Sequence, residues 1–185
     1  NRTLRGLEQP VLDSLGIDKN YQRGQHRAIV GTPILEDGDI ALKATLQETN
    51  EWQPFDFPVA TTLRHFCIET LSSYTEDNQA CISEIELIDD KGQPIDKKKW
   101  ETVYVSSEQT DKNMGIAENL FDGDISSFWH TDADADPHHP HRIIVDMKEI
   151  YKVSAIRFKV RKGSFLSGKV KDVNIYARPQ FFLFQ

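Results

Sequence analysis

The chain has 185 residues, of which 38% are hydrophobic and 28% charged, with a formal net charge of −7. This length suits one domain, and the apolar content is too high for a disordered chain. An acidic chain without a basic block argues against nucleic acid and against an anionic membrane surface as partners. No apolar run approaches the roughly 18 residues that a membrane span needs, so we expect no span. The start at Asn1, without Met or an apolar signal-type segment, suggests a mature or excised chain.

The first 24 residues differ from the rest of the chain in their sequence pattern. A short helix is predicted over Leu7 to Leu15, because Pro10 lies near its start and Gly16 follows its end. We therefore expect residues 1–24 to form an N-terminal extension and residues 25–185 to form the folded domain.

From Gln25 onward, short β-branched and aromatic runs alternate with turns, which is typical of an all-β domain. Between Val153 and Val160, apolar and basic residues alternate, which predicts a strand with one buried face. Such runs predict an antiparallel β-sandwich of jelly-roll type. The predicted strands are Leu63–Thr70, Ala80–Ile88, Trp100–Ser106, His141–Met147, Val153–Val160 and Val170–Ala177. The apolar Phe181 to Phe184 is expected to add a strand that closes the sheet.

Two cysteines, Cys67 and Cys81, are too few for a disulfide framework. They lie on two apolar stretches joined by a polar turn, so a cross-strand bridge and two buried free thiols both fit. The pair does not decide the compartment.

One turn carries a pattern of hard oxygen ligands. Asp122, Asp124 and Ser127 stand at positions i, i+2 and i+5 around Gly123. Calcium takes six to eight such oxygens, from carboxylates and backbone carbonyls. The turn alone does not fit the EF-hand pattern, and taken by itself it is better explained as a surface β-turn.

Several separated motifs resemble, in order, the coagulation factor 5/8 type C (discoidin) family. The likeness is to its carbohydrate-binding-module branch, as in the galactose-binding modules of galactose oxidase and of bacterial sialidases. It covers about residues 98–177 and implies a galactose-binding-domain-like sandwich. The motifs are Asp122-Gly123-Asp124, Phe128-Trp129-His130-Thr131, Pro140-His141, Ile144-Val145-Asp146-Met147, Arg161 and Gly168 to Tyr176.

An earlier segment resembles the strand pair that usually closes this family's domain. Leu63 to Ser73 and Ile82 to Leu87 carry this likeness, yet they precede the rest of the domain. A circularly permuted sandwich explains this order, and so does an extra copy of the pair with a truncated end. Trp52 to Pro58 could be the strand that leads into the exchanged half.

The resemblance implies a buried structural calcium site. Carboxylates would come from Asp122 and Glu84, and Ser127 would bind through its hydroxyl and carbonyl, where the family often has Thr. Backbone oxygens would come from Asn119, Asp124 and Ser83.

The resemblance also implies a sugar site on the loops at one end of the sandwich. His130 and Arg161 match positions that hydrogen-bond the hydroxyls of a galactose-type ligand. Ser167 stands near a position where the family commonly has Asn, Phe165 could stack on the ring, and Asn113 could contribute from its loop.

The site residues also have structural interpretations. His130 could cap a loop, Arg161 could form a surface ion pair, and Trp129 is expected in the core. The cluster His138-His139-Pro140-His141 invites a zinc interpretation, but a structural hydrogen bond suits His141 better. The run Lys97-Lys98-Lys99 is expected to be a solvated turn.

The resemblance implies a non-catalytic, calcium-containing carbohydrate-binding module. It would anchor a larger secreted, glycan-active protein to galactose-like or amino-sugar glycans, outside the cell, at its surface or in the periplasm. A discoidin-type adhesion module that binds protein or lipid is the alternative. An enzyme is not expected, because the best-placed carboxylates, Asp122 and Glu84, are better explained as calcium ligands.

Overall fold

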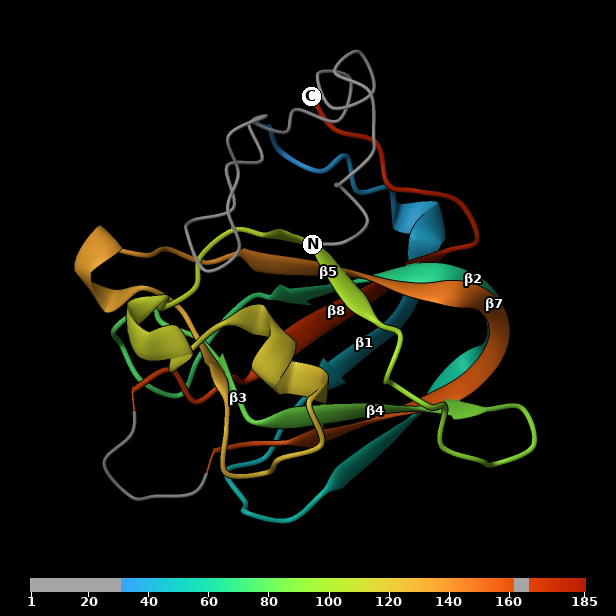
Figure 1. The fold of residues 1–185 in the computed structure, drawn as a ribbon, viewed down its shortest axis with the longest axis horizontal. Coiled ribbons are helices and arrows are strands. Elements are labelled where there is room, and N and C mark those ends of the chain that lie inside the picture. Colours follow the sequence, from blue (N-terminus) through green and yellow to red (C-terminus); the bar gives the residue numbers. More distant parts are fainter. Residues whose placement is uncertain (1–30, 162–166) are drawn as a thin grey trace.

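The structure, a computed structural model, describes residues 31–161 and 167–185. Nearly all its regular structure is β (Figure 1). The strands are β1 (Ile40–Thr45), β2 (Gln53–Thr70), β3 (Cys81–Ile82), β4 (Glu84–Asp89), β5 (Glu101–Val105), β6 (Trp129–His130), β7 (His141–Lys159) and β8 (Asp172–Arg178). Short 3-10 turns are η1 (Asp37–Asp39), η2 (Asp111–Asn113), η3 (Ala117–Phe121) and η4 (Ala133–Ala135).

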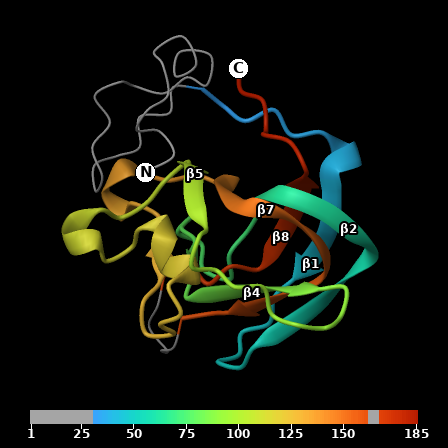
Figure 2. The ribbon, with the colours of Figure 1, turned by 45° about the vertical axis from the view of Figure 1, so that its right-hand side comes forward.

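Two long strands, β2 and β7, run through both layers of an antiparallel β-sandwich. The end of β2 pairs with the start of β7, and this half continues to β8 and β1 on one side and β5 on the other. The start of β2 pairs with the end of β7, and this half continues to β4. Figures 1 and 2 show both strands curving over between the layers. The predicted fold class is confirmed.

The bend has a local cause in each strand. The pairing of β2 with β7 shifts register between Asp56 and Thr61 and again between Leu63 and His65. On β7, Lys148 has a φ of 70°, and Ile150 is 62% exposed. Such irregularities bend a strand and increase its twist. The two strands predicted as His141–Met147 and Val153–Val160 are therefore one bent strand.

The core fills the space between the layers. Phe66 from β2 meets Trp100 edge-on with ring centroids 5.5 Å apart, and Trp100 contacts Phe121 of η3 at 5.8 Å. Trp129 is fully buried, as predicted, and its indole N–H donates to the carbonyl of Ser107 at 3.0 Å. These aromatic side chains hold η3 and β6, which carry the candidate site, against the sandwich.

The outer face of the larger layer carries a second apolar cluster. It contains Cys67, Tyr104, Ile144, Tyr176 and Phe182. Residues 31–36 and the C-terminal residues run side by side over this face, joined by backbone hydrogen bonds and a bridge between Pro33 and Phe184. The expected closing strand over residues 181–184 is therefore wrong. This segment makes a single bridge outside the sheet, because it pairs with the segment before β1 and not with a strand of a layer.

The remaining predicted elements divide into three groups. The strands expected at Trp100–Ser106 and Val170–Ala177 correspond to β5 and β8, and Trp52 to Pro58 lies mostly within β2. The strand expected over Ala80–Ile88 is split at Ser83 into β3 and β4. The expected helix over Leu7 to Leu15 lies outside the described residues.

The segment that resembles the family's closing pair is integral to the sandwich. Strand β2 lies between β7 and β8, and β4 pairs with β7. The two segments thus belong to the same sheet as β7 and β8, which are strands of the segment that resembles the family.

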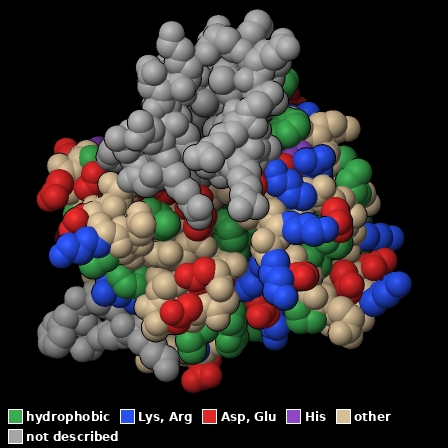
Figure 3. Space-filling view, in the orientation of Figure 1, with side chains coloured by type: hydrophobic (Ala, Val, Ile, Leu, Met, Phe, Trp, Pro, Cys, Tyr) green, Lys and Arg blue, Asp and Glu red, His purple; other side chains and the backbone are tan. Residues whose placement is uncertain are grey.

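Both cysteines are free and buried, and they lie in different parts of the fold. Cys67 belongs to the outer-face cluster, whereas Cys81 lies in β3. Within the described residues, no helix has the length and apolar character that crossing a membrane requires. On the face drawn in Figure 3, acidic and basic side chains are interspersed.

Candidate functional site

Strand β3 brings three loops to one end of the sandwich. Cys81 pairs with His130 of β6, and its N–H donates to the carbonyl of Gly168 at 2.7 Å. Gly168 has a φ of 74°, and a Cβ there would lie 3.0 Å from the backbone of Ala80. Only glycine allows this loop to approach β3 so closely. The segments around residues 81, 130 and 168 therefore form one surface.

Two of the predicted sugar ligands are in contact. The Nε2 atom of His130 lies 3.0 Å from the hydroxyl of Ser167, and its Nδ1 atom lies 2.6 Å from the carbonyl of Thr131. A carbonyl only accepts, so Nδ1 carries a hydrogen and donates it to Thr131. His130 is half-buried, so it is held by the fold and still borders solvent.

Arg161 stands two residues after the end of β7, and its side chain acts on Cys81 of β3. Its guanidinium carbon lies 3.7 Å from the centroid of the Phe128 ring, a close cation–π contact. Burial raises the pKa of the neighbouring Cys81 thiol to about 12, although the charge and a hydrogen bond of Arg161 act in the opposite direction. No ion pair of Arg161 is found within the described residues, so the predicted surface ion pair does not hold it there.

The contact with Phe128 was not predicted. Phe128 stands one residue before the buried Trp129, so strand alternation places it on the same side as His130. This alternation was the signal in the sequence that could have identified it.

Neither of the two remaining predicted sugar ligands is shown in contact with His130 or Arg161. Asn113 is exposed with a φ of 58°, and its carbonyl accepts from the side chain of Asn119 at 3.2 Å. Its loop reaches the site through Gly115, whose carbonyl accepts from the N–H of His130 at 3.1 Å. Phe165 lies outside the described residues.

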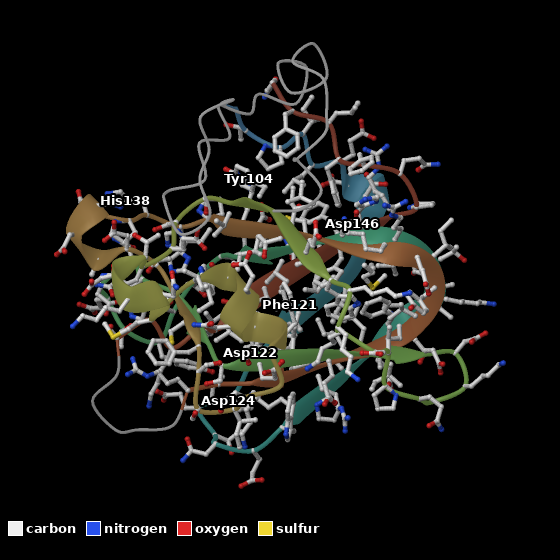
Figure 4. All side chains as sticks on the ribbon, in the orientation of Figure 1. Tyr104, Phe121, Asp122, Asp124, His138 and Asp146 are labelled. Carbon is white, nitrogen blue, oxygen red and sulfur yellow. The ribbon has the colours of Figure 1, made fainter. Side chains whose placement is uncertain are left out.

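The predicted calcium ligands converge on the turn after η3. The Ser127 hydroxyl lies 2.7 Å from the Asp122 carboxylate, 2.9 Å from the Asp124 carbonyl and 3.4 Å from the Asn119 carbonyl. Figure 4 shows Asp122 and Asp124 on this turn, beside β4. Four hard oxygens thus come together from one short segment, although the turn is exposed and not buried as predicted.

Glu84 approaches this turn from β4. Its Oε2 atom accepts from the N–H of Gly123 at 3.1 Å, and its Oε1 atom accepts from the Lys97 ammonium at 2.6 Å. Burial raises the pKa of the Glu84 carboxyl to about 7, and the Asp122 charge adds to the rise, while Lys97 opposes it. The neighbouring Ser83 is buried between β3 and β4.

Lys97 corrects one expectation. It was predicted in a solvated turn, but its side chain is 15% exposed and also donates to the Ile85 carbonyl at 3.0 Å. It folds back because Glu84 is a buried carboxylate that needs a partner.

The oxygen set therefore suits a hard cation of the calcium type. The carboxylates of Asp122 and Glu84 face one turn, and uncharged oxygens come from Ser127 and the backbone. Lys97 partly neutralises the acidic cluster and would compete with a bound cation for Glu84. The described residues hold no group of three or more His, Cys, Asp or Glu side chains that could bind a metal ion, so backbone and hydroxyl oxygens would have to contribute.

The histidine cluster serves a structural purpose. The Nε2 atom of His141 lies 2.6 Å from the Asn78 carbonyl, and His139 contacts the Thr70 carbonyl at 3.2 Å. These contacts fasten the loop between β2 and β3, which agrees with the hydrogen-bonding role predicted for His141. His138 is exposed at the left edge of the molecule in Figure 4.

Comparison with known proteins identifies the domain type. The F5/8 type C domain matches residues 96–180, which confirms the resemblance that the motifs in this segment predicted. A relative with a similar segment is a sialidase of Micromonospora viridifaciens, 36% identical over 85 residues. The match covers 44% of this chain and 13% of the sialidase.

Proposed function

We propose that this chain is a non-catalytic carbohydrate-binding module that recognises galactose-like or amino-sugar glycans. The observation that carries the proposal is the cluster around β3, where His130 and Ser167 are in contact and Arg161 stacks on Phe128. Fixed polar side chains beside an aromatic ring suit a sugar, whose hydroxyls need hydrogen bonds and whose C–H face needs apolar contact.

The family and the relative support this proposal. The F5/8 type C match covers the segment that carries His130 and Arg161, and the similar relative is named a sialidase. We propose that the chain belongs to a larger extracellular, cell-surface or periplasmic protein that acts on glycans. The module would hold that protein at its substrate.

Calcium is proposed as a structural cofactor of the turn between Asp122 and Ser127. Bound there, the ion would neutralise the two acidic side chains and fix the turn that leads into β6. Asp122, Glu84 and Ser127 would hold it together with the carbonyls of Asn119, Asp124 and Ser83.

Melting temperature against calcium concentration tests this cofactor, because a ligand that binds only the native state must stabilise it. We expect added calcium to raise the melting temperature of the chelated protein and to leave that of the Asp122→Asn variant unchanged. Lys97→Met should increase the response, since it removes the cation that competes for Glu84. An unchanged melting temperature in the unmodified chain would remove the calcium site and leave the sugar site standing.

A glycan array tests the main proposal. The unmodified chain should bind galactose-type or amino-sugar glycans, and the double variant His130→Ala, Arg161→Ala should lose this binding while remaining folded by circular dichroism. Attachment to cells or lipid vesicles without any glycan signal would favour the adhesion-module alternative instead.

A further inference from the structure

A cavity is lined in part by Arg161, which also contacts Phe128 at the candidate sugar site. Its volume is about 260 Å³, which is below the roughly 300 Å³ of drug-sized pockets and leaves room for about one sugar ring. It is formed where the loop between β1 and β2 meets the end of β7 and the start of the segment leading to β8. The lining residues are Gln47, Glu48, Thr49, Asn50, Tyr74, Val160, Arg161, Lys169 and Val170.

The cavity combines an apolar base with a fixed aromatic side chain. Val160 and Val170 are buried, with exposures of 6% and 1%. The Tyr74 hydroxyl donates to the Leu46 carbonyl at 2.7 Å, so its ring is held in place, yet 37% of this residue is exposed. A fixed, partly exposed ring is available for the C–H face of a sugar.

The walls of the cavity are basic, although the whole chain carries a net charge of −7. Arg161 and Lys169 line the cavity, and the Lys159 ammonium donates to the carbonyl of Asn50, another lining residue. A fourth cation, Lys171, lies 5.6 Å from the Tyr74 ring. This local reversal of sign favours an anionic ligand.

One acidic residue forms a long ion pair with this basic group. Glu48 is half-exposed, and its Oε1 atom lies 3.8 Å from the Lys169 ammonium. A partly exposed pair at this distance contributes little, so a better-placed carboxylate can replace Glu48.

We propose that this cavity is a subsite for a carboxylate-bearing sugar, a hexuronic acid, next to a neutral sugar held at His130. The inference rests on the proposed function and adds the chemical class of the second sugar. Arg161 lines the cavity and contacts Phe128, which is near His130 in the sequence, and its planar guanidinium matches a carboxylate in a bidentate way. Lys169 supplies the second positive charge, and Tyr74 contacts the ring.

Calorimetric titration with two matched disaccharides tests the subsite. The probes are α-1,4-linked galactobiose and the disaccharide of the same linkage in which one galactose is replaced by galacturonic acid, so that they differ in a single carboxylate. The unmodified chain should bind the acidic probe more tightly. Lys169→Met should lower the affinity for the acidic probe about tenfold and leave the affinity for the neutral probe unchanged. Glu48→Gln should raise the affinity for the acidic probe a few-fold, because it removes the carboxylate that competes for Lys169.

The control variant is Lys91→Met, which removes one positive charge in the turn after β4. The opposite end of β4 pairs with Lys159 near the cavity, so the control lies far from it and should bind like the unmodified chain. Equal affinity for both probes, or no effect of Lys169→Met, would overturn the subsite alone. Stronger binding of galactose 6-sulfate than of galacturonate would overturn the carboxylate as its ligand. Failure of the unmodified chain to bind either probe or any glycan would overturn the proposed function itself.

Discussion

Asp146 is fully buried, and its carboxylate is held by three basic residues. Arg64 donates to both of its oxygens, at 2.8 and 3.0 Å, and Lys148 and His65 lie 3.3 and 3.4 Å from it. Burial alone would raise the pKa of this carboxyl, but the hydrogen bonds from His65 and Arg64 hold it well below its usual range. Its ionised form therefore stabilises the fold above the unfolded pKa of about 4, and this contribution is lost as the pH falls below that value.

Asp146→Asn should lower the free energy of unfolding at pH 7 by about 3 kcal/mol, because Arg64 loses its charged partner. The difference from the unmodified chain should shrink as the pH falls below about 4, since the carboxylate advantage disappears there. Urea unfolding at pH 7 and at pH 3 measures both values. A variant that is as stable as the unmodified chain at pH 7, or one with the same deficit at both pH values, would contradict this assignment.

The two thiols should be inert in the native protein. Burial raises the pKa of Cys67 well above its usual range and that of Cys81 to about 12, so thiolate is scarce at pH 8. Mass spectrometry after iodoacetamide should show no modification in native buffer and two modifications in denaturant. Rapid labelling of native Cys81, or a disulfide between the two residues, would show that the surroundings of β3 differ from those described.

The individual site residues were predicted from motifs, whereas their partners were not. The motif around His130 carried the predicted sugar position, and the structure places His130 in contact with Ser167, another predicted ligand. Tyr74 and Lys169 meet Glu48 only in three dimensions, because they come from loops far apart in the sequence. No local pattern encodes such a cavity, since its shape depends on how the bent strands bring the loops together.

Among the elements, the loop at Gly168 decides whether the site forms. Its φ of 74° and its contact with Ala80 leave no space for a side chain. Gly92 has a similar φ of 79° but nothing within 4 Å of an added Cβ. Comparing substitutions at Gly92 and Gly168 therefore distinguishes the effect of backbone strain from the effect of a close contact with Ala80.

Gly92→Ala should cost about 1 kcal/mol of stability through strain alone and leave glycan binding unchanged. Gly168→Ala should cost more and should also weaken glycan binding, because it pushes the loop with Ser167 away from β3. Thermal unfolding and calorimetric titration measure the two effects. Equal losses in both variants, with binding intact, would show that the close approach at Gly168 does not shape the site.

Element types were predicted well from the sequence, and element boundaries less well. The alternation of Ile156, Phe158 and Val160 against Arg157 and Lys159 identified the second half of β7. The sequence did not show that this half continues from the first half as one strand, because the bulge at Lys148 looks like a polar loop between two strands. Likewise, the apolar C-terminal segment was expected in the sheet, although it covers a face that no local pattern reveals.

At the scale of the whole molecule, the two ends of the described domain close over the outer face of the larger layer. Phe182 is 2% exposed within the cluster that includes Cys67 and Tyr104, whereas its neighbour Leu183 is 61% exposed. Both are apolar residues in the same segment, so they form a matched pair.

Phe182→Ala should lower the free energy of unfolding by about 3 kcal/mol, because it leaves a cavity in this cluster. Leu183→Ala should change it by less than about 0.5 kcal/mol, as is usual for surface positions. Urea denaturation of both variants provides the comparison. Similar values for the two would mean that the C-terminal segment does not seal the outer face.

Sugar recognition on the surface around β3 is the central claim, and mapping of backbone amide signals by NMR during titration with a galactoside tests it most directly. We expect the largest shifts at Cys81, His130, Arg161 and Gly168, with Phe182 on the outer face unaffected. Shifts confined to the outer face, or no shifts at saturating sugar, would contradict the claim.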